Sequence, residues 1–99
     1  MAMFVGALKF RLRLPESGSL KEKRHVVKSV AARLQNEFKV TAAEVGEQDS
    51  WQVAEMGVAC VGNAARHVEE VMARAAAYVE RNWPELEMLD LETETLQAF

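Results

Sequence analysis

The residues best suited to binding an anion lie together in the polar segment 19–28. Three cations follow Ser19 at the start of a predicted helix, and Lys28 continues the same segment. A helix N-terminus carries partial positive charge, which disfavours cations there unless an anion is bound nearby, and its free amides bind phosphate. We therefore expect an anion or nucleic-acid site made of Ser19, Lys21, Lys23, Arg24 and Lys28. The alternative is a solvated basic surface.

A second, weaker set of cations alternates along the first predicted strand and shares one of its faces: Lys9, Arg11 and Arg13. On an open sheet face, such residues suit RNA. Sheets that bind RNA stack its bases on exposed aromatic side chains, whereas the aromatic residues of this strand share the opposite face. We therefore favour a cross-strand charge ladder. Its acidic partners would be residues of the last predicted strand, namely Asp90, Glu92 and Glu94.

Little in the chain points to catalysis. Glu44 and Asp49 near Trp51 would be an acid/base pair, but we favour a turn in which Asp49 bonds its own backbone. Trp51 then serves in packing or as an interface anchor. Cys60 lies in an apolar strand and is expected to act as a small hydrophobic residue. The two histidines lack the spacing of metal ligands. We expect no catalytic residue, no metal site and no cofactor.

The elements that position these residues follow from periodicity. Alternating apolar residues predict a strand over 3–14, and Ser19 with Glu22 forms a capping box that begins a helix over 19–37. Gly62 and Asn63 are expected to cap the second helix, and Leu96 to lie at a bulge or a frayed end. The remaining predicted elements are strands over 39–46, 51–61 and 86–97 and a helix over 64–82.

The order β-α-β-β-α-β predicts one α+β domain over residues 1–99 with the ferredoxin-like arrangement. This fold is a four-stranded antiparallel sheet, with strand order 4-1-3-2 and both helices on one face. The open face is expected to carry an apolar patch that is large for a monomer. We therefore predict a homodimer, formed face to face or along the edge of the second strand. The patch consists of Val5, Ala7, Val53, Gly57, Ala59 and Val61.

Composition is typical of one folded domain, with 49% hydrophobic and 27% charged residues among 99. A single cysteine fits a reducing compartment. There is no signal-peptide pattern and no membrane-spanning run, so a cytoplasmic location is expected. Net charge is +6 over residues 1–40 and −9 over residues 41–99. This asymmetry indicates either a basic face for nucleic acid or two halves that pair with each other.

Three segments make the chain resemble the YlxP-like family of small bacterial proteins, whose function is unassigned. They are Val5-Gly6, Ser19-Leu20-Lys21-Glu22-Lys23-Arg24 and the stretch AEVGEQDSWQ over 43–52. The resemblance covers nearly the whole chain and implies a ferredoxin-like fold without assigned catalytic residues. Genes of the family tend to lie among translation and ribosome-maturation factors, which implies a connection with RNA or the ribosome.

Together these features favour a non-catalytic module that binds RNA or a ribosomal particle through the basic start of the first helix. The alternative is a homodimeric protein-interaction or small-anion-binding module with no nucleic-acid role.

Overall fold

Strand β1 (Phe4–Arg13) is an inner strand of the sheet, and its row of large apolar side chains faces the helix layer, in which α2 lies against it. The computed structural model describes residues 1–99. The sheet is antiparallel, with the order β2-β3-β1-β4. The predicted fold and strand order are confirmed. The other elements are α1 (Leu20–Phe38), β2 (Thr41–Gly46), β3 (Val53–Gly62), α2 (Ala65–Asn82) and β4 (Glu87–Gln97).

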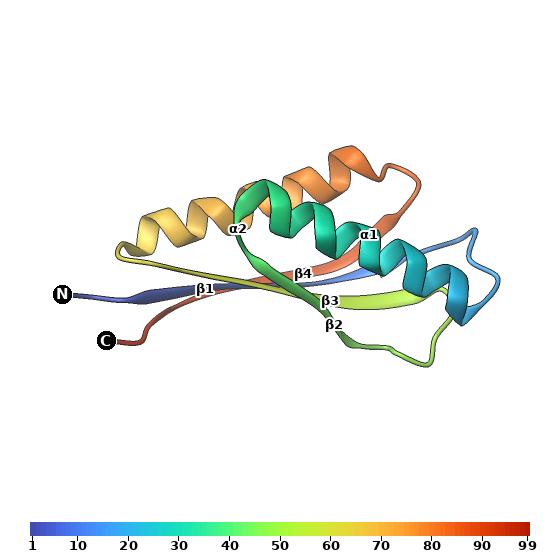
Figure 1. Cartoon of the computed structure of the whole chain (residues 1–99), viewed down its shortest axis with the longest axis horizontal. Coiled ribbons are helices and arrows are strands. Elements are labelled where there is room, and N and C mark those ends of the chain that lie inside the picture. The colour runs from blue at the N-terminus through green and yellow to red at the C-terminus, as the bar shows by residue number, and fades with distance from the viewer.

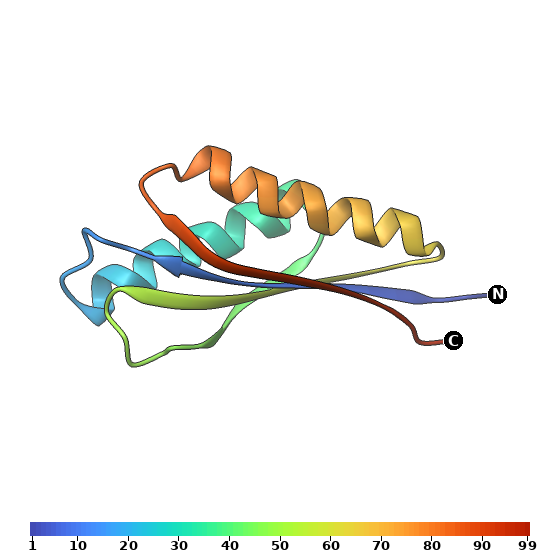
Figure 2. The ribbon, with the colours of Figure 1, turned by 180° about the vertical axis from the view of Figure 1, so that it is seen from behind.

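Both helices lie on one side of the sheet and leave its other face open (Figures 1 and 2). The core forms between this helix layer and the sheet because each helix turns one apolar stripe inward. Helix α1 contributes Val27, Val30 and Leu34, while α2 contributes six buried residues between Val68 and Val79. The alternate residues Leu8, Phe10 and Leu12 of β1 are buried, as is Leu14 directly after the strand.

Element boundaries differ from the predicted ones where backbone groups find local partners. Strand β2 begins at Thr41 because Lys39 adopts a left-handed conformation (φ 52°) that ends α1. Strand β3 begins at Val53 because the Ser50 hydroxyl accepts hydrogen bonds from the amides of Gln52 and Val53. The prediction that Gly62 and Asn63 cap α2 is wrong. Strand β3 pairs with β1 as far as Gly62, and Ala64 takes the cap position without a side-chain bond.

The edge strand β4 contains a bulge at Leu89 rather than an irregularity at Leu96. Asp90 pairs with Arg11 and Met88 pairs with Leu12, so Leu89 has no partner on β1. Leu96 pairs regularly with Val5, so the predicted irregularity at Leu96 is wrong. The extra residue moves Met88, instead of Leu89, against the core.

Helix α2 approaches β1 most closely at Gly6. A Cβ atom on Gly6 would lie 2.9 Å from Cβ and 3.0 Å from the carbonyl oxygen of Val68. Both atoms belong to a rigid part of a packed helix, so they have little freedom to move aside. Glycine is therefore required by the spacing of the two layers.

We predict that Gly6→Ala lowers the free energy of unfolding by about 1–3 kcal/mol, the usual cost of overpacking. Urea denaturation followed by circular dichroism measures the change. Gly18→Ala is the matched control because its new Cβ would lie 3.6 Å from the nearest atom, a carboxylate oxygen of Glu22. Equal midpoints for wild type and Gly6→Ala would show that the layers are not in close contact at this position.

Candidate nucleic-acid interface

Lys23, one of the predicted anion-binding residues, is a residue of α1 whose side chain is buried on the side of the helix that faces the sheet. Its side chain is fully inaccessible, and its ammonium donates to the carbonyl oxygens of Glu47 (2.6 Å) and Val53 (3.0 Å). The ammonium nitrogen also lies 2.9 Å from Oε2 of Glu44, whose side chain is largely buried. The two carbonyl oxygens take two of the three donors of the lysine, and the Glu44 carboxylate balances its charge without a hydrogen bond. The expectation that Lys23 contacts an external anion is therefore wrong.

The helical position of Lys23 explains its burial. It stands four residues before Val27, and the spacing then continues to Val30 and Leu34, so all four lie on the stripe that faces the sheet. Lysine has a long aliphatic stem that crosses apolar surroundings while its charged end finds partners. The helical spacing that buries Lys23 could be read from the sequence, but the groups that its ammonium contacts could not.

Two backbone amides at the start of α1 have side-chain partners within the chain. The Glu22 amide donates to the Ser19 hydroxyl (3.1 Å), and the Gly18 amide donates to the Glu22 carboxylate (2.7 Å). The Ser19 half of the predicted capping box is thus confirmed, whereas the Glu22 carboxylate accepts from Gly18 and not from the Ser19 amide. Ser19 is the helix cap, and the Glu22 carboxylate lies beside it, bonded to the Gly18 amide.

The remaining predicted cations of α1 form a strip on its outer side. Lys21, Arg24 and Lys28 are exposed, and none has a carboxylate within 4.0 Å. Spacings of three and four residues place them on one face of the helix. We call Lys21, Arg24 and Lys28 the outer strip. No carboxylate of this chain neutralises the positive charge of the outer strip.

The cations of β1 are paired, as the charge-ladder interpretation predicted. Lys9 lies 3.4 Å from Glu92, and Arg11 lies 3.1 Å from Asp90. Glu94 was wrongly included among the expected partners. The Leu89 bulge shifts the register, so Arg13 faces Glu87 at 3.9 Å.

Arg11 is held by a second carboxylate that the sequence did not indicate. Its guanidinium lies 2.9 Å from Glu47, in the turn after β2. The hydrogen bond to Asp90 has the largest effect and raises the pKa of Arg11, desolvation opposes it, and the charges of Glu47 and Asp90 raise the pKa further. Arg11 therefore stays charged, but its charge is already balanced by this chain's own carboxylates.

The turn between β2 and β3 is braced by Lys23 and Ser50, and it leaves Trp51 exposed. Ser50, and not Asp49, provides the side-chain bonds to the local backbone, so the role predicted for Asp49 is wrong. Trp51 is 56% exposed, which contradicts a packing role. Glu44 is paired with Lys23, whereas Asp49 is exposed to solvent. The two carboxylates are therefore not arranged as an acid/base pair.

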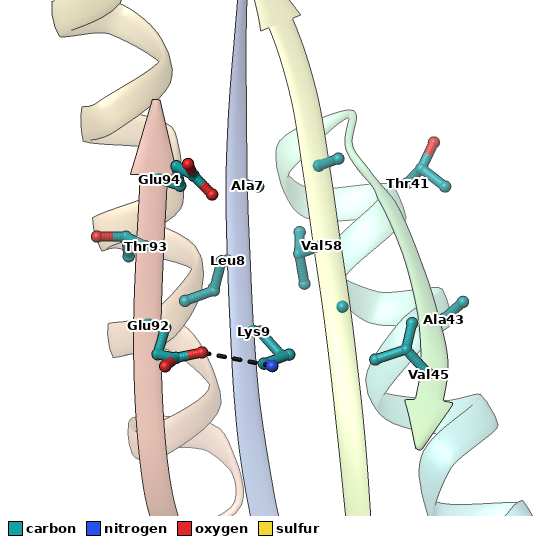
Figure 3. A pocket seen from close by; sticks show the side chains of 12 residues that line it. Ala7, Leu8, Lys9, Thr41, Ala43, Val45, Val58, Glu92, Thr93 and Glu94 are labelled. Atoms are coloured by element: carbon teal, nitrogen blue, oxygen red, sulfur yellow. Dashed lines mark ion pairs between the residues drawn. The ribbon is translucent and has the colours of Figure 1, made fainter. Parts of the chain in front are cut away.

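The open face of the sheet contains a shallow groove of about 980 Å³ (Figure 3). Small side chains form much of its floor, and Val45 borders it on β2. The Lys9–Glu92 pair lies on the β1 and β4 side. The groove is thus apolar at its centre and charged at its border. Its small and apolar lining residues include Ala7, Ala43, Val45, Gly57 and Ala59.

The cysteine and the possible metal ligands of the chain do not form a reactive or metal-binding cluster. Desolvation raises the pKa of the Cys60 thiol, partly opposed by a hydrogen bond with the Gly6 backbone. A thiol with a raised pKa is a poorer nucleophile at neutral pH. No group of three or more His, Cys, Asp or Glu residues is placed to hold a metal ion. Neither helix is long and apolar enough to cross a membrane.

Comparison with known proteins identifies one family and one similar sequence. The family model described as "Protein of unknown function (DUF503)" matches residues 5–93. The uncharacterized protein YlxP of Bacillus subtilis (strain 168) is 39% identical over 79 residues, which cover 80% of this chain and 85% of the relative.

Two solved structures share the fold at low sequence identity. One is a dimeric protein of unknown function with a ferredoxin-like fold from Bacteroides fragilis NCTC 9343. It has a TM-score of 0.57 and 10% identity, over 96% of this chain and 95% of the other. The other is the de novo designed protein Foldit4. It has a TM-score of 0.50 and 15% identity, over 95% and 96% of the two chains.

We predict that Lys23→Met destabilises the protein by about 3–5 kcal/mol, because it leaves the Glu44 carboxylate buried without its partner and frees two carbonyl groups. Urea denaturation measures the change. Lys21→Met, at an exposed position of the same helix, is the control and should change stability by less than about 0.5 kcal/mol. Equal losses for the two variants would contradict an internal role for Lys23.

Proposed function

The chain belongs to the DUF503 family, whose function is unknown, and from that premise we propose a non-catalytic module that binds RNA or a ribosomal particle. Binding takes place on the outer strip of α1. The observation that carries the proposal is the sorting of cations: those of β1 are paired and Lys23 is buried, whereas Lys21, Arg24 and Lys28 are exposed and unpaired.

The length of the outer strip suits a nucleic-acid backbone. Lys21 and Lys28 are seven residues apart, which is about 10 Å along a helix axis. Phosphates of one strand recur roughly every 3.4 Å along a duplex axis, so this distance spans several of them. Lysine and arginine bind phosphate without regard to base sequence. We therefore expect binding that depends on charge and on the presence of a phosphate backbone.

The net charge of the protein limits how RNA approaches. The chain carries −3 overall, and its acidic residues are concentrated after residue 40. An acidic protein repels RNA at long range, so association depends on local positive potential. The outer strip lies on α1 in the helix layer, whereas β4 with its acidic residues belongs to the sheet (Figure 1). Three further glutamates, Glu69, Glu70 and Glu80, lie on α2. This arrangement favours binding through α1.

We predict that a fluorescent single-stranded RNA binds the protein at 50 mM salt and that affinity falls steeply as salt rises. Three phosphate contacts give a slope of about −2 for log affinity against log salt. Raising salt from 50 to 200 mM would then cost roughly twentyfold in affinity. Fluorescence anisotropy measures the binding. Replacing Lys21, Arg24 and Lys28 together by glutamine should abolish the slope.

The control variant removes the same charge from other exposed positions, namely Lys39, Arg74 and Arg81, which also have no carboxylate within 4.0 Å. It should retain most of the affinity if the outer strip is the site. Equal loss in both variants would indicate attraction by overall charge alone. No binding at 50 mM salt would reject RNA as the partner. Co-sedimentation with ribosomal particles then tests the narrower version of the proposal.

A second candidate function is a homodimeric protein-interaction module, and the apolar open face of the sheet favours it. Helices cover one face of the sheet only (Figure 2), and Val61 and Leu96 on the other face are half exposed or more. The Bacteroides fragilis protein of the same fold is described as dimeric. We therefore propose self-association as the role of the open face.

A further inference from the structure

The open face carries complementary bulky and small rows of side chains. Val5 pairs with Val61 on one side and with Leu96 on the other, so these three form a bulky row across three strands. Val61 is 67% exposed and Leu96 is 50% exposed. Two residues further along β1, Ala7 pairs with Ala59 on one side and with Glu94 of the edge strand β4 on the other, and all three line the groove.

The next row along the strands completes the groove. Gly57 pairs with Lys9 and with Ala43, so the floor stays low across β2 and β3. The Val45 side chain leans over Gly57, where a Cβ would lie 2.9 Å from it. This arrangement gives the groove an apolar wall (Figure 3). The row containing Gly57 and the bulky row lie on opposite sides of the Ala7–Ala59 row.

We propose that a second copy of this chain covers the open face, related by a two-fold axis that runs across the strands over the Ala7–Ala59 row. This inference rests on the second candidate function. The axis reverses the strand direction, so the bulky row of each copy lies over the Gly57 row of the other. Val61 of each copy then contacts Gly57 and Val45 of its partner, and Ala59 faces its own counterpart. Both grooves are filled at once, as an isologous interface requires.

Charge opposes this pairing at one edge only. Glu94 pairs with Ala7, so it lies in the axis row opposite its own counterpart, but it stands on the exposed edge strand β4, where its side chain can turn toward solvent. The nearest cation, Lys9, is already paired with Glu92 within the same copy. A charge that has a partner costs less to cover than an isolated one. The second copy contacts the sheet only, so the outer strip of α1, on the other layer, stays free for RNA.

The area of overlap predicts the strength of the dimer. An axis at Ala7 leaves about seven residues of each strand in register, which at ~3.3 Å per residue and ~4.8 Å between strands covers roughly 450 Å² per copy. The pair buries on the order of 900 Å², which is below the range of about 1,200–2,000 Å² for stable complexes. We therefore expect reversible self-association in the micromolar range.

Sedimentation velocity over about 5–500 μM protein is the first test. Wild type should show a monomer–dimer equilibrium. Val61→Asp, at an exposed position that the fold tolerates, should weaken it at least tenfold. Trp51→Ala removes a large exposed apolar residue outside the overlap and should leave it unchanged within twofold.

Cross-linking tests the position of the axis. In a Cys60→Ala background, Ala59→Cys should form a disulfide-linked dimer under mild oxidation, because the two residues meet at the axis. Val61→Cys should not, since its own counterpart lies about 14 Å away along the strands.

The outcomes separate the inference from the function on which it rests. A wild-type dimer that Val61→Asp leaves intact, or that Val61→Cys links better than Ala59→Cys, would overturn the proposed geometry while preserving self-association. A wild type that remains monomeric at the highest concentration would reject both. Neither result bears on RNA binding, which is measured separately.

Discussion

The buried ammonium of Lys23 fixes how the first helix meets the β2–β3 hairpin. It brings the carbonyl oxygens of Glu47 and Val53 to one point and pairs with the Glu44 carboxylate. These contacts close the turn that carries Trp51 and hold it against the start of α1. A buried pair of this kind offsets a large desolvation cost, so its role is to specify one arrangement more than to add net stability.

Burial of Lys23 changes where positive charge is available. The basic first part of the chain and the acidic second part do pair with each other, through β1 with β4 and through Lys23 with Glu44. Of the cations that the sequence singled out, only those of the outer strip remain unpaired, and they point away from the sheet. The two surfaces left without partners inside the chain are therefore a basic one on the helix layer and an apolar one on the sheet. Each suits a different kind of partner.

Periodicity was sufficient to predict the fold, because alternating and helical patterns directly report which face of each element is buried. Details set by distant partners were not predictable. The role of Lys23 depends on Glu44 and on two backbone carbonyls, and carbonyls have no sequence signature. The Leu89 bulge depends on how β4 fits beside β1, so its effect on the charge ladder emerged only with the register. The exposed cations Lys21, Arg24 and Lys28 were identifiable from sequence, but their separation from Lys23 was not.

The division between one internal lysine and an external basic strip is tested most directly by NMR of the lysine ammonium groups during RNA titration. The account predicts a slowly exchanging signal for Lys23 that RNA does not move, and shifts for Lys21 and Lys28 as RNA is added. A fast-exchanging Lys23 ammonium, or a Lys23 signal that moves while those of Lys21 and Lys28 stay still, would contradict it.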